Sequence, residues 1–155
     1  MLKLETMSDP DFQLYLRRAI PQYAYDQVRG GNWTPEESVG RASAEFRQSL
    51  TNGPQTEGHY LLTIFDEKGA KVGMIWWAMN QRGKQKIAFL ADFFIFGEFR
   101  HKGYEKEALA LLEEHARAQG ATRMELQIFA HNAEDRDMYK ASDFGEVSVY
   151  FGKNI

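Results

Sequence analysis

A short basic stretch near the middle of the chain has the clearest chemical potential. The nearly continuous apolar run Ile87 to Phe96 is followed by a loop with three basic side chains and a glycine, and then by a helical pattern that begins near Tyr104. A strand–loop–helix unit directs free backbone N–H groups and the positive end of the helix dipole outward, which favours phosphate binding. The alternative is a solvated helix start with a lone glycine. The basic side chains are Arg100, His101 and Lys102, with Lys106 one turn further on.

The elements that must position this loop alternate between helices and strands. Apolar spacing predicts a helix over Asp11–Arg29, and Pro21 is expected to kink or break this helix. A second helix is predicted after Thr34, where a capping box is expected. The order is β-α-α-β-β-β-α-β-α-β, which predicts an α/β (α+β) fold with a mixed sheet and helices on its faces. The remaining predicted elements are strands at Leu2–Thr6, His59–Phe65, Val72–Met79, Ile87–Phe96, Met124–Ile128 and Val147–Phe151, and helices at Tyr104–Gln119 and Asn132–Ala141.

Length and composition exclude several classes of protein. The chain has 155 residues, so we expect a single domain over residues 1–155. The net charge of −3 argues against a nucleic-acid partner, which would require a basic face. The longest apolar run, Val72 to Met79, is too short to cross a membrane. With no apolar signal core at the N-terminus, we expect a cytoplasmic protein with no membrane partner.

Cysteine and histidine usage narrows the chemistry further. The absence of cysteine excludes disulfides, thiolate catalysis and cysteine-based zinc sites. The four histidines show no metal-ligand spacing, so we predict no metal site. Aromatic residues make up 14% of the chain. They indicate either a core built from large side chains or a cleft with aromatic walls, which is typical of small-molecule sites.

Two half-motifs at the right separation resemble the GNAT superfamily of N-acetyltransferases. The family's pyrophosphate loop, Arg/Gln-x-x-Gly-x-Gly/Ala, corresponds here to Arg100-x-x-Gly103-x-Glu105. The resemblance covers essentially the whole chain and implies a mixed, mostly antiparallel central sheet flanked by helices. The second pattern, Asn-x-x-Ala-x-x-Leu-Tyr before Gly-Phe, corresponds to Asn132, Asp135, Met138, Tyr139, Asp143 and Phe144.

The resemblance implies acetyl-CoA as co-substrate and a role for each matching residue. One backbone N–H of the central strand would polarise the thioester carbonyl, and Tyr139 would protonate the departing thiolate. Asn132 would hydrogen-bond the pantetheine or a water, or it could serve as a helix N-cap. Tyr139 could alternatively be an aromatic residue of the core. The implied cofactor-binding residues are Phe93, Phe94, Ile95, Arg100, His101, Lys102, Gly103, Tyr104, Glu105, Lys106, Asn132 and Tyr139.

The general base is less clearly indicated. Gln127 stands at one position where the family often has a glutamate, and an amide cannot act as a base. Asp92, inside the apolar central strand, is the best remaining carboxylate, because burial would raise its pKa. Its alternative role is structural, with hydrogen bonds to the backbone or to an arginine. Glu125 ranks below Asp92.

Departures from the family pattern add negative charge near the expected cofactor path. Glu105, Asp135 and Asp143 replace small residues, and Gly97 stands where proline is common. A carboxylate near a pyrophosphate would weaken binding unless it points away, and we expect Asp143 to adopt a left-handed backbone conformation.

Three hypotheses follow. The first is direct acetyl transfer to a primary amine of a small molecule or peptide. The second is an inactive module of the same fold that binds an acyl-CoA or a partner. The third is a generic mixed α/β protein whose loop binds another phosphate ligand. Oligomeric state is left open, a homodimer included. The candidate acceptor-side residues are Tyr15, Tyr23, Tyr25, Trp33, Asp26, Glu36 and Glu37, whose aromatic and acidic groups suit a cationic amine.

Overall fold

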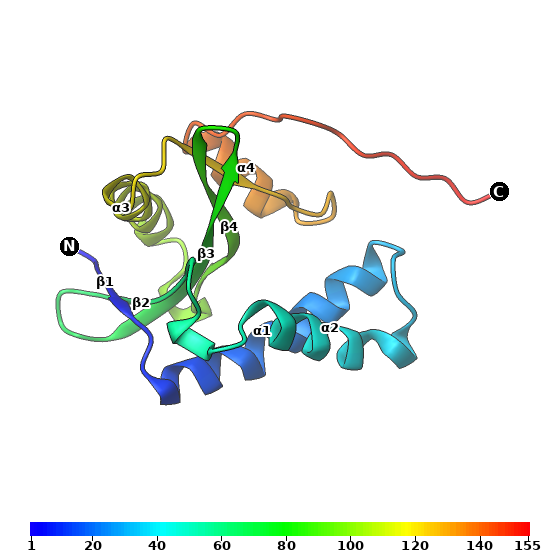
Figure 1. The fold of residues 1–155 in the computed structure, drawn as a ribbon, viewed down its shortest axis with the longest axis horizontal. Helices are drawn as coiled ribbons and strands as arrows, with labels where there is room; N and C mark the ends of the chain where they lie inside the picture. The colour runs from blue at the N-terminus through cyan, green and yellow to red at the C-terminus, as the bar shows by residue number, and fades with distance from the viewer.

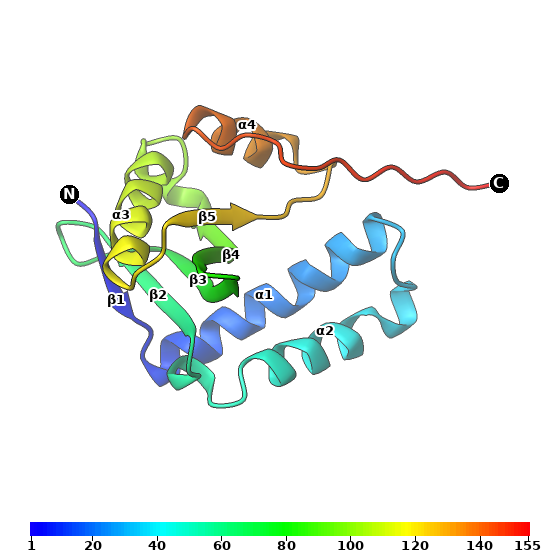
Figure 2. The ribbon, with the colours of Figure 1, turned by 45° about the horizontal axis from the view of Figure 1, so that its top comes forward.

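A five-stranded sheet runs through the molecule, with helices on both of its faces (Figures 1 and 2). The computed structural model describes residues 1–155. In chain order the elements are β1 (Lys3–Thr6), α1 (Asp9–Arg29), α2 (Pro35–Ser49), the 3-10 turn η1 (Gly53–Gln55), β2 (His59–Phe65), β3 (Lys71–Arg82), β4 (Gln85–Ile95), the 3-10 turn η2 (Gly97–Phe99), α3 (Tyr104–Ala118), β5 (Arg123–Leu126) and α4 (Ala133–Ala141).

The strands lie in the sheet in their order along the chain. β1 to β4 are antiparallel neighbours, and β5 pairs with β4 in parallel. The parallel pair requires a crossover connection, which α3 provides between β4 and β5. The predicted mixed, mostly antiparallel sheet flanked by helices is confirmed.

The feature that positions the candidate site is the unequal length of β4 and β5. β5 pairs only with Ile87–Leu90 of β4, so the second half of β4 has a neighbour, β3, on one side alone. The pairing with β3 shifts by one residue at Ala91, which is a β-bulge. A bulge bends and twists the strand that carries it. The segment from Ala91 to Ile95 therefore forms an open edge between β4 and β5.

Two apolar clusters pack the two faces of the sheet. Met74 and Leu61 face α1 and α2, together with the buried Tyr15 and Phe46. The alternate residues of the same strands face α3 and α4, because side chains along a strand point to opposite faces. The second cluster includes Leu62, Ile75, Trp77, Leu109, Leu112 and Tyr139.

Two sequence expectations differ from the structure. α1 is one uninterrupted helix through Pro21, because its buried residues, among them Tyr15 and Ala24, pack on both sides of the proline. The last predicted strand, Val147–Phe151, is absent: the alternation is present, but no strand of the chain pairs with it. Alternation alone does not make a strand, since a strand needs a hydrogen-bonded neighbour. No helix has the length and apolar character of a membrane span.

Gly73 provides a test of this arrangement, because a Cβ there would collide with the carbonyl oxygen of Phe94 on β4. We expect Gly73→Ala to lower the free energy of unfolding by about 1–3 kcal/mol, the usual cost of overpacking. Urea denaturation followed by circular dichroism measures this change.

Gly40→Ala is the matched control for that experiment. Gly40 lies in α2 with open space around it, so alanine should raise stability by roughly 0.5–1 kcal/mol through helix propensity. Equal stability of Gly73→Ala and the wild type would contradict the close approach of β3 and β4.

Candidate active site

The loop between β4 and α3 has two residues in the left-handed backbone region. Gly103, directly before α3, has φ 83°, and His101 has φ 61°. Glycine adopts this region without steric cost. α3 has no side-chain cap, and Glu107 N donates to the Gly103 carbonyl oxygen at 3.4 Å. The N–H groups of the residues before Glu107 in the first turn have no partner inside the helix.

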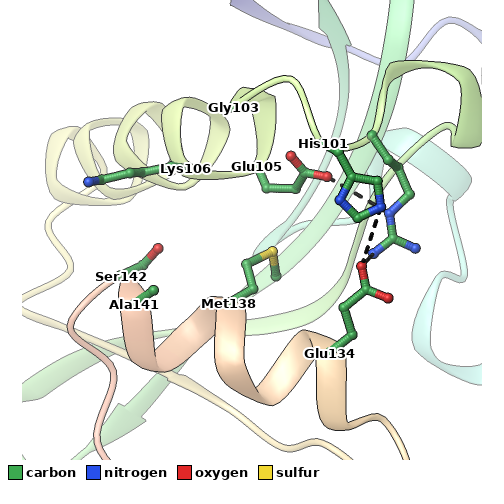
Figure 3. A pocket seen from close by; sticks show the side chains of 9 residues that line it. His101, Gly103, Glu105, Lys106, Glu134, Met138, Ala141 and Ser142 are labelled. Carbon is green, nitrogen blue, oxygen red and sulfur yellow. Dashed lines mark hydrogen bonds and ion pairs between the residues drawn. The ribbon is translucent and has the colours of Figure 1, made fainter.

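A cleft of about 240 Å³ lies between the start of α3 and α4 (Figure 3). Its first wall is the basic loop and first turn of α3, and its second is the exposed side of α4. The cleft therefore combines a helix N-terminus with basic side chains, the combination that binds anions. It is lined by Arg100, His101, Gly103, Glu105, Lys106, Glu134, Met138, Ala141 and Ser142.

Arg100 lies among three carboxylates at this cleft. Its Nη2 donates to Glu134 Oε1 at 3.1 Å and lies 3.7 Å from Asp135 Oδ1, while its Nε is 3.8 Å from Glu105 Oε1. Burial raises the pKa of Asp135, with Arg100 opposing and the nearby carboxylates adding to the shift. The Arg100 side chain is 36% exposed, so each pair is worth ~0–1 kcal/mol. An incoming phosphate can displace these pairs.

The other predicted loop residues lie in different places. Lys102 and Tyr104 line a separate hollow beside the β2–β3 turn, and Lys102 Nζ is 5.7 Å from the centre of the Phe99 ring. Their side chains are thus away from the cleft, although the Tyr104 backbone remains in the first turn of α3. Asn132 precedes α4, but its side chain makes no capping hydrogen bond. Asp143 has φ 69°, so its predicted left-handed conformation is confirmed.

The backbone of the open edge can be assigned by strand alternation. Phe96 N donates to the Val72 carbonyl oxygen at 2.8 Å, so the amide of Phe96 faces β3. Backbone groups of alternate residues face alternate neighbours, which directs Phe94 toward β3 as well. Phe93 and Ile95 therefore direct their N–H and C=O groups toward the open side. Of the three predicted residues, these two direct backbone groups to the open side. The Phe93 N–H also hydrogen-bonds the Asp92 carboxylate, which leaves the Ile95 N–H as the free donor.

Asp92 lies next to the bulge, with its carboxylate toward α1. Tyr15 Oη donates to Asp92 Oδ2 at 2.9 Å, and Tyr15 is fully buried. Asp92 keeps some accessible surface, yet desolvation by the surrounding protein raises its pKa to about 6, while hydrogen bonds from Tyr15 and the Phe93 backbone oppose the shift. Asp92 is therefore ionised near neutral pH and has the pKa of a usable base.

Tyr139 lies on the opposite face of the sheet, within the cluster beneath α3. It is 9% exposed and packs edge-on against Phe144 at 5.6 Å between ring centres. The Tyr139 hydroxyl makes no hydrogen bond within the protein. Because every buried side-chain polar atom has a hydrogen-bond partner, this hydroxyl must have some solvent-accessible surface. Burial, with the charges of Asp135 and Asp92, raises the pKa of Tyr139. The phenol therefore stays protonated and can donate.

The structure separates the predicted acceptor-side residues. Asp26 lies near the site, because its charge raises the pKa of both Asp92 and Asp135. Tyr23 instead packs on Trp33 at 5.5 Å and donates to Glu45, as part of the contact between α1 and α2. Tyr25 is exposed beside Arg29, and Glu36 and Glu37 begin α2, where Glu37 accepts from Thr34 and Arg41.

Sequence reasoning missed three contacts at the site. Tyr15 was expected on the acceptor side, but its partnership with Asp92 joins residues 77 positions apart and has no local signature. Glu134 resembles an ordinary first-turn carboxylate. His131 Nε2 lies 3.0 Å from Asp26 Oδ1 and connects α1 to the loop before α4.

Glu125, the second candidate for the base, accepts hydrogen bonds from Arg82 and Arg123. These lower its pKa to about 2, so it is a poor base. No group of acidic and histidine side chains is arranged to hold a metal ion.

Comparison with known proteins identifies the family. The model of the acetyltransferase (GNAT) family matches residues 25–144, which is most of the chain. The chain belongs to the GNAT acetyltransferase family. Members of the GNAT family generally use acetyl-CoA. The sequence resemblance to this family is thus confirmed.

Two relatives from Bacillus subtilis (strain 168) match nearly the whole of this GNAT chain, and both are described as uncharacterized N-acetyltransferases. YycN is 32% identical over 154 residues, 99% of each chain, and YdgE is 28% identical, covering 98% of this chain and 97% of its own. The crystal structure of YycN has a TM-score of 0.95 and covers 100% of this chain and 99% of its own. An aminoglycoside 6'-N-acetyltransferase from Acinetobacter baumannii, 22% identical with a TM-score of 0.59 over 100% of this chain and 99% of its own, shares the fold.

The carboxylates around Arg100 give a test of the cleft. We expect Glu105→Gln to tighten CoA binding by roughly three- to tenfold at low salt, because a like charge close to the phosphates is worth about 1 kcal/mol. The gain should shrink at high salt, where charges are screened. Isothermal titration calorimetry with CoA at two salt concentrations measures the effect.

Glu114→Gln is the control, since Glu114 is exposed on the same helix and lines no part of the cleft. It should leave the affinity for CoA unchanged. Unchanged or weaker binding of CoA by Glu105→Gln would mean that the pyrophosphate does not lie beside Arg100.

Proposed function

We propose that this GNAT protein transfers the acetyl group of acetyl-CoA directly to a primary amine of a small molecule or peptide. The observation that carries the proposal is the open edge of β4, with Asp92 on one face of the sheet and Tyr139 on the other. The charge of Asp92 raises the pKa of Tyr139, so the two groups interact electrostatically. Without cysteine, no thiol of the chain can carry the acetyl group in between.

The residues present fit acetyl-CoA in two places. The Phe93 carbonyl and the free backbone groups of Ile95 suit the amides of the pantetheine arm, which would add to β4 as a further strand. The cleft at the start of α3 suits the pyrophosphate, with Arg100 as the cation and the first-turn N–H groups as donors. The side-chain amide of Asn132, which is not used for capping, is available to the same arm.

Acid–base catalysis follows from the two titratable groups. Acetyl-CoA supplies an activated thioester, and the reaction forms a C–N bond while the C–S bond breaks. Asp92, ionised above about pH 6, would accept the proton of the attacking amine directly or through water. Tyr139 would give its proton to the sulfur, and an N–H of the open edge would stabilise charge on the carbonyl oxygen.

The charge around Asp92 favours a cationic acceptor. Asp26 is the carboxylate whose charge raises the pKa of Asp92, and Arg18 is the cation whose charge lowers it. The Arg18 guanidinium is already 3.9 Å above the Phe94 ring. The carboxylates therefore outnumber the cations at this end, which would attract a protonated amine before it loses its proton.

The second candidate is an acyl-CoA-binding module without turnover. The observation in its favour is the group of three carboxylates on Arg100, which opposes the binding of a pyrophosphate. Binding of CoA with no acetylation of any amine in a broad panel would favour this candidate over the enzyme.

Tyr139→Phe tests the acid. Phenylalanine keeps the ring packed against Phe144 but removes the proton donor, so we expect the turnover number to fall by roughly 10²–10⁴-fold. The dissociation constant for acetyl-CoA should change little. Steady-state kinetics on an accepted amine, with calorimetry for binding, separates these effects. Wild-type turnover in this variant would exclude Tyr139 as the acid.

The pH dependence of kcat/KM tests the base. Because ionised Asp92 is the active form, the acid limb of the pH profile of kcat/KM should rise with an apparent pKa of about 6. Asp92→Asn should abolish the limb and lower kcat/KM by ~10²–10⁴-fold. Tyr15→Phe removes a hydrogen bond that favours the ionised carboxylate, so it should move the limb to higher pH.

The wild type, Asp92→Asn and Tyr15→Phe are measured with the same amine. The titration of the amine itself then contributes equally to all three pH profiles. A limb that stays in place in Asp92→Asn would show that another group controls the rate. An unmoved limb in Tyr15→Phe would contradict the influence of the Tyr15 hydroxyl on Asp92.

A further inference from the structure

One arginine of α1 reaches over the open half of β4. The guanidinium carbon of Arg18 lies 3.9 Å from the centre of the Phe94 ring, which makes a cation–π contact. That ring is itself fixed, because it stacks on the buried Tyr15 with 6.3 Å between ring centres and meets Phe96 edge-on at 5.7 Å. Arg18 is therefore held at a defined place, although it is exposed to solvent.

The guanidinium of Arg18 has no partner of opposite charge. Beyond the Phe94 ring, Arg18 makes no salt bridge and no hydrogen bond within the protein. Arg41, the other arginine that lies over an aromatic ring, also pairs with Glu37 at 2.7 Å. An arginine held on an aromatic face keeps its N–H donors for a planar partner such as a carboxylate. Arg18 thus offers a complete set of donors at the site.

Asp92 lies beside this arginine on the same side of the sheet. Asp92 and Phe94 are two residues apart on β4, so their side chains point to the same face about 7 Å apart. Tyr15 touches both, because its hydroxyl donates to Asp92 and its ring stacks on Phe94. The charge of Arg18 also lowers the pKa of Asp92. A carboxylate and a guanidinium therefore face the same space next to the open edge.

Arg18 does not serve as the hydrogen-bond partner of Asp92. The oxygens of Asp92 accept from the Tyr15 hydroxyl and from the Phe93 N–H instead. A direct bond from a guanidinium to a carboxylate would be about twice as strong as such a bond between neutral groups. The two opposite charges nevertheless stand side by side without a direct bond, which leaves each of them available to a ligand.

We infer that the acceptor is an amino acid with a free carboxylate, and that Arg18 binds this carboxylate while the amine lies at Asp92. The amine and the carboxylate of an α-amino acid are one carbon apart. With one hydrogen bond of about 3 Å at each end, such a molecule can bridge side chains about 7 Å apart. A bidentate bond to the guanidinium would also fix the direction of the amine.

This inference rests on the proposed acetyl transfer and names its substrate class. The C–N bond forms and the C–S bond breaks as described above, and the amine proton passes to Asp92. The acceptor carboxylate keeps its bonds and its charge, so the products are an N-acetylamino acid and CoA. Arg18 also repels an amine that brings no carboxylate, so it selects between acceptors as well as binding them.

Steady-state kinetics with matched acceptors tests the substrate class. Each of the common amino acids is compared with its amide, which stands for a peptide N-terminus, and with the amine formed by removal of its carboxylate. For the accepted amino acids we expect kcat/KM to exceed that of both analogues by about 10–100-fold, the usual worth of a hydrogen bond to a charged group.

Substitution of Arg18 tests the residue. Arg18→Gln should lower kcat/KM for amino acids by about 10–100-fold and should not lower it for the matched amines. Arg18→Lys keeps the charge but loses the planar fork, so it should restore part of the preference. Arg17→Gln is the matched control, since Arg17 is an exposed arginine one position away that points to a different side of α1. It should leave the preference unchanged.

Calorimetry separates this inference from the proposed function. Amino acids are titrated into protein saturated with CoA, which has no acetyl group to transfer. We expect binding to the wild type and affinity about 10-fold or more weaker in Arg18→Gln, while circular dichroism of the variant stays native because Arg18 is exposed. If no amine is acetylated, the proposed function fails, and this titration still decides whether Arg18 holds a carboxylate.

Three results would overturn the inference. The first is a kcat/KM for amides or simple amines that equals or exceeds that of the matched amino acids. The second is an equal loss of activity toward both kinds of acceptor in Arg18→Gln. The third is a complex with CoA that binds no amino acid, or that binds amino acids equally well with and without Arg18.

Discussion

The candidate site depends on one constraint: backbone groups in a sheet need partners, and β4 extends beyond β5. The half of β4 after the bulge pairs with β3 alone, so Phe93 and Ile95 direct their amides toward an open side. An unpaired edge inside a fold is costly unless a ligand or water satisfies it. Asp92 and Tyr139 lie on opposite faces of the sheet at this open half of β4.

Burial and charge divide the open edge into two chemically different ends. At the α3 end, Arg100 is partly exposed and its carboxylate partners are weakly held, so phosphate oxygens can replace them. At the α1 end, Asp92 is enclosed by protein and fixed by the hydroxyl of the fully buried Tyr15. Solvent screening weakens the first set of ion pairs, while desolvation raises the pKa of Asp92 in the second.

The sequence was informative where the pattern is local. The basic loop, the α3 start and the left-handed Asp143 all follow from short-range spacing and backbone preference. Contacts between distant segments were not accessible: nothing near residue 15 indicates a bond to Asp92, and nothing in the loop reveals that Lys102 points away from the cleft. The C-terminal strand failed for a related reason, because alternation predicts a strand but cannot supply its neighbour.

Hydrogen exchange at individual backbone amides tests the central claim most directly. Phe94 N–H, which faces β3, should exchange slowly with or without acetyl-CoA. The Ile95 N–H should become markedly more protected when acetyl-CoA is added, because the ligand would complete the open edge of β4. Unchanged protection of the Ile95 amide at saturating acetyl-CoA would contradict the account.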